Sequence, residues 1–554
     1  MLAFLKNKKI ILAIVIVSFI GAGIFLLLYS ELLNPKYDAW LLTASADPTQ
    51  HYVGWAMYRH SDWSFPLGLA NNYGYPFGIP ITYTDSIPLL AIIFKLLNIF
   101  LPPVFQYFGI WLLLCFVLQA VFGYLLIKIM VRGQMIPVLG SILFVLSPAF
   151  LFRPFALAGQ WLILAGLWLV LKPHKNIQWW QWSLLFFLSL LIHPYLFFMN
   201  GFLMLADLIQ LLVTKKTKIK PALLFFIWQV FLVTIIAYSL GLFLVGETNA
   251  EGFGEFSMNL NSLINPLGHW SILLADLPVT QYQGEGFSYL GLGILFLTIL
   301  SLYSAAKNKI LFKAMKQCWP LLLICLFLTL LALSNVVTLN SAILIDFKLP
   351  KIITNNLLGV VRASGRFFWP VFYLILLASF YILKTKKTKV ALVLIILAIF
   401  CQTTDLSYKL KELGTGFEQK NWSNQIDSTD WQNIAKDYKH ISFLPVIPHR
   451  TYISFILFAA QNKMTVNNGY FARPIKGLDQ YIEKENNEVK AGIIKKDTIY
   501  ILTRDSDTYL TNLDLNKHLL VRIDRTVALC SYYREVHPNT NYQNGQELKV
   551  NMAN

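Results

Sequence analysis

Long apolar runs separated by short polar segments fill the chain from Ile10 to Cys401. A helix needs about 20 mainly apolar residues to cross the hydrocarbon core of a membrane. The clear runs are 10–30, 104–130, 135–152, 155–171, 195–213, 221–245, 287–304, 319–334 and 367–383. Two shorter runs, 179–192 and 390–401, are included because flanking tryptophan and lysine side chains can extend a short span into the interface. The pattern predicts an α-helical polytopic membrane protein with about eleven transmembrane helices.

The first apolar run and the segment Asp85–Phe100 decide how the chain is threaded. Lysines precede the first run, but no small-residue cleavage site follows it, so we predict an uncleaved anchor with a cytoplasmic N-terminus. The segment Asp85–Phe100 is also apolar. If it crossed the membrane, the later lysine clusters would face the opposite side. We therefore predict that it forms an amphipathic helix in the interface.

The basic excess of the chain follows this topology. The 554 residues carry a formal net charge of +17, yet only 14% are charged, against about 25% in an average soluble protein. Nineteen of the lysines and arginines lie in the N-terminal segment and the loops predicted to be cytoplasmic, with no acidic residue among them. Cytoplasmic loops of membrane proteins carry such an excess, so the charge does not indicate a nucleic-acid partner. We predict a bacterial inner-membrane protein with an extracytoplasmic C-terminus.

The polar segments predict two domains. Residues 1–401 form the membrane domain, which has a large first outer loop at 31–103, and residues 402–554 form a small extracytoplasmic α/β domain. In this second domain, His440–Val446 and Thr498–Thr503 resemble strands, and Tyr452–Lys463 resembles a helix. Cys401 and Cys530 both fall on the outer side, where a disulfide between them and two free thiols are the alternatives.

The first outer loop concentrates ionisable residues among aromatic side chains. If Pro48 starts a helix, Asp47 is its N-cap, and His51, Trp55 and Arg59 follow on one face at spacings of four residues. Asp38 and Asp85 lie in the same loop. The structural alternative is a capping aspartate in an ordered interfacial loop. The functional alternative is favoured because polar groups beside lipid are costly unless they serve a site.

Further ionisable residues fall at the same predicted membrane level. Arg153 ends the run LSPAFLFRPF, His193 precedes a proline in LLIHPYLFF, and Arg362 and Arg366 lie in VRASGRFFWP. Snorkelling to headgroups is the structural alternative for Arg153, and a hydrogen bond to the backbone is the alternative for His193. Two arginines four residues apart can hold a phosphate by bidentate contacts. We predict phosphate binding by Arg362 and Arg366.

The long aromatic-rich first loop with an early aspartate, about ten spans and an outer C-terminal domain together resemble the GT-C superfamily of membrane glycosyltransferases. The segments DPTQHYVGW, FPLG, TDSIPLLA and RASGRFFWP are similar to those of an uncharacterised bacterial multi-pass membrane protein family. The GT-C resemblance implies transfer of a sugar from a polyprenyl-phosphate donor on the non-cytoplasmic side. The matching catalytic carboxylate is Asp47, with Asp38 as the second candidate. No DxD pair stands at Asp47, and the WWDYG signature of oligosaccharyltransferases is absent.

We therefore expect a glycosyltransferase that acts on a cell-envelope glycan, lipid or protein acceptor. A carboxylate base would deprotonate the acceptor hydroxyl, and arginines would stabilise the leaving phosphate. The predicted phosphate-binding residues are Arg362, Arg366 and Arg153, and the predicted substrate-orienting residues are His51, His193, Arg59 and Asp85. No cofactor or metal is expected, although Asp47, His51 and His193 leave a divalent cation open. The rival hypotheses are a transporter or flippase and a non-catalytic membrane scaffold.

Overall fold

The computed structural model describes residues 8–44, 47–244, 252–307, 316–350, 352–353, 358–417, 420–424, 426, 428–445, 453–502, 509, 512–514, 516–524, 526–533 and 546–547. The chain divides into two compact units. The first unit comprises Met1–Pro35, Tyr107–Ile236 and Thr248–Gln419, and the second comprises Lys36–Gln106, Ala237–Glu247 and Lys420–Asn554. The first polar loop thus belongs to the same unit as the C-terminal segment.

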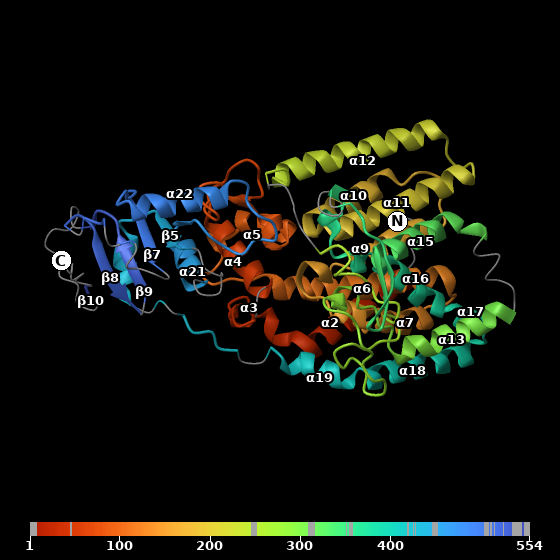
Figure 1. Ribbon diagram of the computed structural model, residues 1–554. Coiled ribbons are helices and arrows are strands. Elements are labelled where there is room, and N and C mark those ends of the chain that lie inside the picture. Colours follow the sequence, from red (N-terminus) through yellow and green to blue (C-terminus); the bar gives the residue numbers. More distant parts are fainter. Residues whose placement is uncertain are drawn as a thin grey trace. The chain divides into compact units, whose positions relative to one another are not determined.

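Each predicted span corresponds to a helix or to a run of adjacent helices (Figure 1). Among the described residues, six segments are long and apolar enough to cross a membrane: α2 with η1 (Lys8–Leu33), α6 (Phe108–Met130), α11 (Pro194–Val213), α12 (Ile219–Leu240), η8 to α17 (Ser364–Thr385) and α18 (Thr388–Asp405). Five further apolar helices in this part of the chain are shorter: α7 (Met135–Val145), η4 with α9 (Phe155–Leu171), α10 (Trp179–Ile192), α13 (Leu292–Lys307) and α15 (Trp319–Leu333). These helices indicate a membrane protein, and the total of about eleven crossings stays a prediction.

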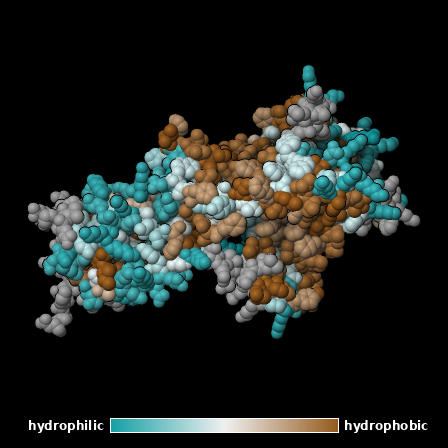
Figure 2. All heavy atoms as spheres, turned by 90° about the horizontal axis from the view of Figure 1, so that it is seen from above, coloured by the Kyte–Doolittle hydropathy of each residue, from teal (hydrophilic) through white to brown (hydrophobic). Residues whose placement is uncertain are grey.

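The surface of the helical unit suits a lipid environment. Figure 2 shows brown, apolar residues across the helical part of the molecule and mainly teal, polar residues over the C-terminal sheet. On α12, for example, Leu224, Ile227 and Phe231 are exposed. Contact of such an apolar surface with water is unfavourable, and soluble monomers rarely expose large contiguous apolar patches. The buried side chains of this unit instead lie where helices meet, as in the edge-to-face pair of Phe25 and Phe116 between α2 and α6.

Two buried polar side chains of α18 satisfy the first turn of α13. The side chain of Gln402 accepts hydrogen bonds from the backbone N–H groups of Gly293 and Ile294, at 3.0 and 3.3 Å. Asp405 accepts from the N–H of Leu292 at 3.0 Å and from the hydroxyl of Tyr289 at 2.7 Å. The first N–H groups of a helix lack partners within the helix, so these contacts fix the start of α13 against α18.

The second unit contains a mixed sheet with the strand order β10-β8-β9-β7-β5-β6. Its strands are β5 (His440–Leu444), β6 (Thr465–Val466), β7 (Thr498–Leu502), β8 (Leu519–Ile523), β9 (Thr526–Cys530) and β10 (Gln546–Glu547). Strand β5 is parallel to β6 and β7, whereas β7, β9, β8 and β10 pair antiparallel. The predicted strands are confirmed as β5 and β7, and the predicted helix is confirmed as α21 (Ile453–Gln461).

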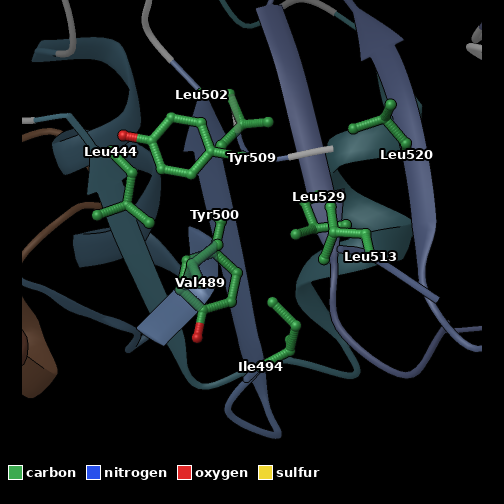
Figure 3. Close-up of a cluster of buried hydrophobic side chains, with 9 residues drawn as sticks. All are labelled: Leu444, Val489, Ile494, Tyr500, Leu502, Tyr509, Leu513, Leu520 and Leu529. Carbon is green, nitrogen blue, oxygen red and sulfur yellow. The ribbon is translucent and has the colours of Figure 1, made fainter. Parts of the chain in front are cut away.

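Helices cover both faces of this sheet. On one face, Phe443 of β5 contacts Phe455 of α21, which in turn contacts Trp431 of α20 (Thr429–Ala435). On the other face, Val489 of α22 (Leu478–Lys490) belongs to a buried apolar cluster (Figure 3). The cluster consists of Leu444, Val489, Ile494, Tyr500, Leu502, Tyr509, Leu513, Leu520 and Leu529. The alternation of side chains along a strand explains how β5 supplies both layers.

The first polar loop joins the sheet through its backbone. The N–H of Tyr75 donates to the carbonyl of Val466 in β6 at 2.8 Å, and the N–H of Ala472 donates to the carbonyl of Tyr83 at 2.8 Å. The loop also contains α3 (Ala39–Leu42), α4 (Asp47–His60), β1 (Leu69–Ala70), β2 (Ile79–Pro80), η2 (Ile81–Thr84), α5 (Pro88–Leu96) and η3 (Asn98–Phe100). The loop and the sheet domain therefore share one hydrogen-bonded framework.

The segment Asp85–Phe100 contains only the nine-residue helix α5 and the short turn η3. Nine residues of α-helix extend about 13 Å, far less than the roughly 30 Å of the hydrocarbon core. Leu96, Ile99 and Phe100 are exposed, by 64, 85 and 78%. This geometry agrees with a segment that does not cross, and its position in the interface stays a prediction.

All five cysteines of the chain are free thiols. Cys401 is partly buried near the end of α18, and Cys530 is fully buried in β9. Burial raises the pKa of the Cys530 thiol to about 12, so this side chain behaves as a small apolar packing group. Of the two alternatives left open for this pair, the structure contains the free thiols.

Candidate functional site

Asp47 is the first residue of α4, one position further into the helix than the predicted N-cap. Its carboxylate is exposed, and its Oδ1 atom lies 3.5 Å from the hydroxyl oxygen of Tyr470, a long hydrogen bond. A helix N-terminus stabilises a negative charge, so the position suits an ionised carboxylate. Asp47 is therefore an accessible acceptor of protons or hydrogen bonds in the second unit.

The face of α4 that carries His51 and Arg59 points into the protein, as both side chains are buried. Arg59 donates to the side-chain oxygen of Asn98 at 2.8 Å and to the carbonyls of Pro102 and Pro103, each at 3.0 Å. These three contacts use the fork of the guanidinium to tie α4 to the segment that follows α5. Arg59 thus has a structural task that explains its burial.

His51 and Asp85 lie near each other beneath α4. The Nδ1 atom of His51 is 3.2 Å from the carbonyl oxygen of Thr84, and the hydroxyl of Ser86 donates to the carbonyl of His51 at 2.6 Å. Burial lowers the pKa of His51, and the nearby negative charge of Asp85 only partly opposes this effect. His51 is therefore a neutral imidazole at neutral pH. Asp85 has a left-handed backbone with φ of 54°.

Asp38, the second candidate carboxylate, is half-buried just before α3. Its Oδ2 atom accepts a hydrogen bond of 2.8 Å from the hydroxyl of Tyr52 in α4. Burial raises the pKa of Asp38, although the hydrogen bond from Tyr52 lowers it in part. Compared with Asp47, this carboxylate is less accessible and is already engaged in a good hydrogen bond.

In the first unit, two of the predicted arginines meet on a carboxylate that the sequence did not single out. The Nε atom of Arg366 lies 2.7 Å from Oε2 of Glu285, and Nη2 of Arg153 lies 2.9 Å from the same oxygen. Arg153 also donates to the carbonyl of Gly284 at 2.9 Å. We call these three side chains, Arg153, Glu285 and Arg366, the arginine–glutamate cluster. They retain 12, 23 and 16% of their exposure, so the cluster is largely removed from water.

The turn that carries Glu285 is held by a buried polar network. Glu285 lies in η5 (Gln283–Gly286). The side chain of Gln283 donates to the hydroxyls of Thr338 at 2.6 Å and Ser257 at 3.1 Å, and it accepts from the side-chain amide of Asn259 at 2.8 Å. Buried polar groups are costly unless they are paired, so this network fixes η5 in one position. The carboxylate of Glu285 is thereby held in place for the arginines.

A close backbone approach brings Arg366 to this turn. Arg366 lies in η8 (Ser364–Phe368), and a Cβ atom on Gly365 would lie 2.6 Å from the Cα atom of Gly286. Only glycine at position 365 therefore lets η8 contact η5 this closely. The guanidinium of Arg366 also lies 5.0 Å from the ring centroid of Tyr195, a cation–π contact.

The two guanidinium groups keep the carboxylate of the cluster ionised. Burial alone would raise the pKa of Glu285, but the guanidinium groups of Arg366 and Arg153 outweigh it and lower the pKa to about 2. Glu285 is thus ionised at neutral pH. Two guanidinium groups directed at one carboxylate oxygen form a position that also suits a phosphate oxygen.

His193 and Arg362 lie outside this cluster. His193 is the N-cap of α11, and its Nδ1 atom accepts a hydrogen bond of 3.1 Å from the N–H of Tyr195. The hydroxyl of Tyr195 accepts from the N–H of Ala363 at 2.8 Å, so His193 supports the segment that leads to Arg366. Arg362 is exposed, and its guanidinium lies 5.6 Å from the ring centroid of Phe256. The structure thus joins Arg366 with Arg153 rather than with Arg362.

Within the part of the chain that the structure describes, no group of three or more His, Cys, Asp or Glu side chains is arranged to hold a metal ion. The candidate residues divide into two sets according to the compact unit to which they belong. Asp38, Asp47, His51, Arg59 and Asp85 belong to the second unit, and Arg153, His193, Arg362 and Arg366 belong to the first.

These features define a helical membrane protein with a small C-terminal sheet domain. Comparison with protein families makes this class more specific. The chain belongs to the family described as a domain of unknown function, DUF6311, whose model matches residues 18–407. The model of the DUF6311 C-terminal domain matches residues 430–531. A search of curated proteins finds no match to the chain.

Proposed function

We propose that this protein is a GT-C-type membrane glycosyltransferase. It transfers a sugar from a polyprenyl-phosphate donor to a hydroxyl of a cell-envelope acceptor on the extracytoplasmic side of the membrane. The acceptor oxygen forms a new bond to the anomeric carbon, the bond from that carbon to the phosphate oxygen breaks, and the polyprenyl phosphate leaves with the electron pair. The acceptor proton passes to a carboxylate base.

The observation that carries this proposal is the convergence of two guanidinium groups in the arginine–glutamate cluster. Arg153 and Arg366 converge on one carboxylate oxygen of Glu285, at 2.9 and 2.7 Å. In the proposal, Glu285 holds the two guanidinium groups together until the donor phosphate takes its place between them. Fixed cations with little access to water stabilise the charge that develops on a leaving group more strongly than mobile cations in water do.

We assign the role of base to Asp47. It is an exposed carboxylate at the first turn of α4, whereas Asp38 is half-buried and bonded to Tyr52. A phosphate leaving group needs little protonation, so the reaction requires one carboxylate and no partner acid. The roles of Asp47 and of the cluster are tested separately because these residues belong to different compact units.

The test is a transfer assay with the full chain in proteoliposomes. Radiolabelled polyprenyl-phosphate hexoses and pentoses are supplied together with an extract of cell-envelope glycans and lipids, and product is scored for the wild type and for Asp47→Asn. We expect a labelled product from at least one donor, and loss of its formation by at least about 100-fold in Asp47→Asn, in line with removal of a general base. The matched control is Asp62→Asn, an exposed carboxylate in the same loop, which should retain wild-type turnover.

Two outcomes contradict the proposal. If no donor in the panel yields product, the glycosyltransferase assignment fails. If product forms at equal rates in the wild type and Asp47→Asn, the enzyme class survives but the assignment of the base is wrong.

A further inference from the structure

The C-terminal domain contains a polar pocket whose residues are neither the proposed base nor part of the arginine–glutamate cluster. It has a volume of about 200 Å³ and lies between strand β5, helix α22 and the first polar loop. We call it the α22 pocket. Its lining includes Tyr75, His440, Ser442, Tyr481, Glu485 and Lys495.

The pocket arises from a change of side-chain type along one face of the sheet. Strand β5 reads His-Ile-Ser-Phe-Leu, and alternate residues of a strand face the same side. Leu444 contributes to the apolar cluster beneath α22 (Figure 3), whereas His440 and Ser442, on the same side of the strand, line the pocket. Helix α22 changes in the same way, from Val489 in the cluster to Glu485 in the pocket. One face of the domain is therefore apolar at one end and polar at the other.

Glu485 is the most unusual residue of the pocket, since its side chain is only 4% exposed. Its Oε1 atom accepts from Nζ of Lys495 at 2.9 Å, and its Oε2 atom accepts from the hydroxyl of Ser442 at 2.7 Å and from the amide of Asn467 at 3.4 Å. A buried ion pair contributes little net stability, because desolvation offsets the attraction. An apolar continuation of the neighbouring cluster would fill the same space more favourably. The polar lining therefore points to recognition of a ligand.

The remaining walls combine aromatic rings with neutral hydrogen-bonding groups. The ring of Tyr75 stacks on His440 with centroids 4.5 Å apart, and the hydroxyl of Tyr481 accepts from Lys495 at 3.0 Å. Burial lowers the pKa of His440, which keeps its imidazole neutral at neutral pH. The ammonium of Lys495 lies 2.9 Å from a carboxylate oxygen of Glu485 and 3.9 Å from one of Glu488, and Lys496 lies exposed at the edge, so two lysines and two glutamates balance in charge. The interior thus offers many donors and acceptors without a net charge.

We propose that the α22 pocket binds one neutral sugar ring of a glycan, which identifies the acceptor class of the proposed glycosyltransferase as a saccharide. A volume of about 200 Å³ is below the roughly 300 Å³ at which pockets begin to hold drug-sized ligands, so the site suits a single ring. Sugar hydroxyls donate and accept at the same time, and the carboxylate, ammonium, amide, hydroxyl and imidazole groups of the lining match both functions. The tyrosine rings supply apolar surface for the C–H groups of the ring.

The test measures binding without any transfer reaction. The purified full chain in detergent is titrated with cellobiose, N,N′-diacetylchitobiose and mannobiose, and saturation-transfer NMR reports which of them binds. We expect at least one disaccharide to bind the wild type, with an affinity at least about tenfold lower in Tyr75→Ala and Glu485→Gln, a loss of about 1.4 kcal/mol or more. Glu483→Gln, an exposed carboxylate on the same helix, is the matched control and should bind as the wild type does.

The variants separate binding from folding. Tyr75 is only partly buried, so Tyr75→Ala tests the pocket even if Glu485→Gln fails to fold. The inference is overturned if the wild type binds none of the disaccharides, or if Tyr75→Ala binds them with unchanged affinity. Only the identification of the bound sugar as the acceptor rests on the proposed function. Binding of a sugar by a chain that shows no transfer would refute the glycosyltransferase and leave the saccharide site, whereas transfer without such binding would do the reverse.

Discussion

Glu285 and Glu485 are two glutamates with cationic partners in different units of the same chain, and their partners differ in kind and number. Glu285 faces two guanidinium groups, from Arg153 and Arg366. Glu485 faces one ammonium group, from Lys495, together with the hydroxyl of Ser442. The first arrangement presents guanidinium N–H groups that suit an anion such as a phosphate, and the second presents hydrogen-bonding groups that suit a neutral ligand.

Glutamate can thus serve two kinds of recognition, depending on whether arginine or lysine is its partner. Arginine presents a planar fork that matches phosphate or carboxylate oxygens, and two such forks share the carboxylate of Glu285. Lysine presents a point charge on a flexible stem, and Lys495 divides its ammonium between Glu485 and Tyr481. We therefore assign the charged end of the donor to the first site and a neutral sugar to the second.

The largest expected effect tests the charged site. Arg366→Ala should reduce transfer by about 10²–10³-fold, as removal of one charge-stabilising donor does elsewhere. Arg362→Ala should have a smaller effect, because Arg362 is exposed and lies outside the cluster. The measurement is turnover with a saturating donor, with thermal unfolding recorded in parallel. Lys348→Ala, an exposed cation nearby in the sequence, serves as the control, and an equal loss in this variant would contradict the role of the cluster.

The second effect tests whether Glu485 depends on its single partner. Lys495→Met should lower the free energy of unfolding by about 2 kcal/mol, below the 3–5 kcal/mol of a fully buried pair, because it leaves the carboxylate without its cation. Because Lys495 is 38% exposed, the expected loss of stability is smaller than for a fully buried pair. Denaturant unfolding of the full chain measures the change. Lys484→Met on the exposed side of α22 is the control, since Lys484 is 75% exposed; equal stability of the two variants would show that the pair is dispensable.

A third effect tests whether Glu285 occupies the place of a phosphate. Glu285→Gln should lower the free energy of unfolding by about 1 kcal/mol, because the two guanidinium groups then repel each other without a shared anion. The same change should raise the affinity for polyprenyl phosphate a few-fold, since the competing carboxylate is gone. Binding titrations and thermal unfolding check both halves. A lower affinity for the phosphate would show that Glu285 assists binding and does not compete with it.

The smallest expected effect is the pH dependence of the contribution that Glu285 makes to the free energy of unfolding. The folded pKa of Glu285 is about 2, below its ordinary value of 4.5. Its contribution is therefore fully present above pH 4.5 and is lost as the pH falls towards 2. The difference in unfolding temperature between the wild type and Glu285→Gln should shrink between pH 7 and pH 3. A difference that stays constant over this range would mean that the carboxylate gains nothing from the arginines.

Much of the fold could be predicted from the sequence because apolar length and strand alternation are local signals. The runs around Phe108–Met130 and Pro194–Val213 have no competing interpretation, and the alternation in His440–Leu444 already indicates a strand. The pairing of the first polar loop with the sheet could not be predicted in this way. It depends on backbone contacts such as Tyr75 with Val466, which leave no trace in the side-chain pattern.

The candidate sites were less predictable because their members are distant in sequence. Arg153 and Arg366 stand near the ends of predicted spans, which indicates a role for them, but Glu285, in the segment QGEG, resembles an ordinary solvated loop residue. Glu485 lies in LDQYIEKENNEVK, a sequence typical of an exposed helix, so the pattern does not predict its burial. A signal was present in β5, where His440 and Ser442 place polar side chains on a face that a central strand normally buries with apolar ones.

The most direct test of the account is a crossed binding experiment with two ligands and two variants of the full chain. Binding of a short-chain polyprenyl phosphate and binding of the disaccharide selected by NMR are measured for Arg366→Ala and for Tyr75→Ala. We expect Arg366→Ala to lose binding of the phosphate and to retain binding of the disaccharide. We expect Tyr75→Ala to lose binding of the disaccharide and to retain binding of the phosphate. Loss of both ligands in either correctly folded variant, or of neither ligand in both, would contradict the assignment of a charged site and a neutral site to this protein.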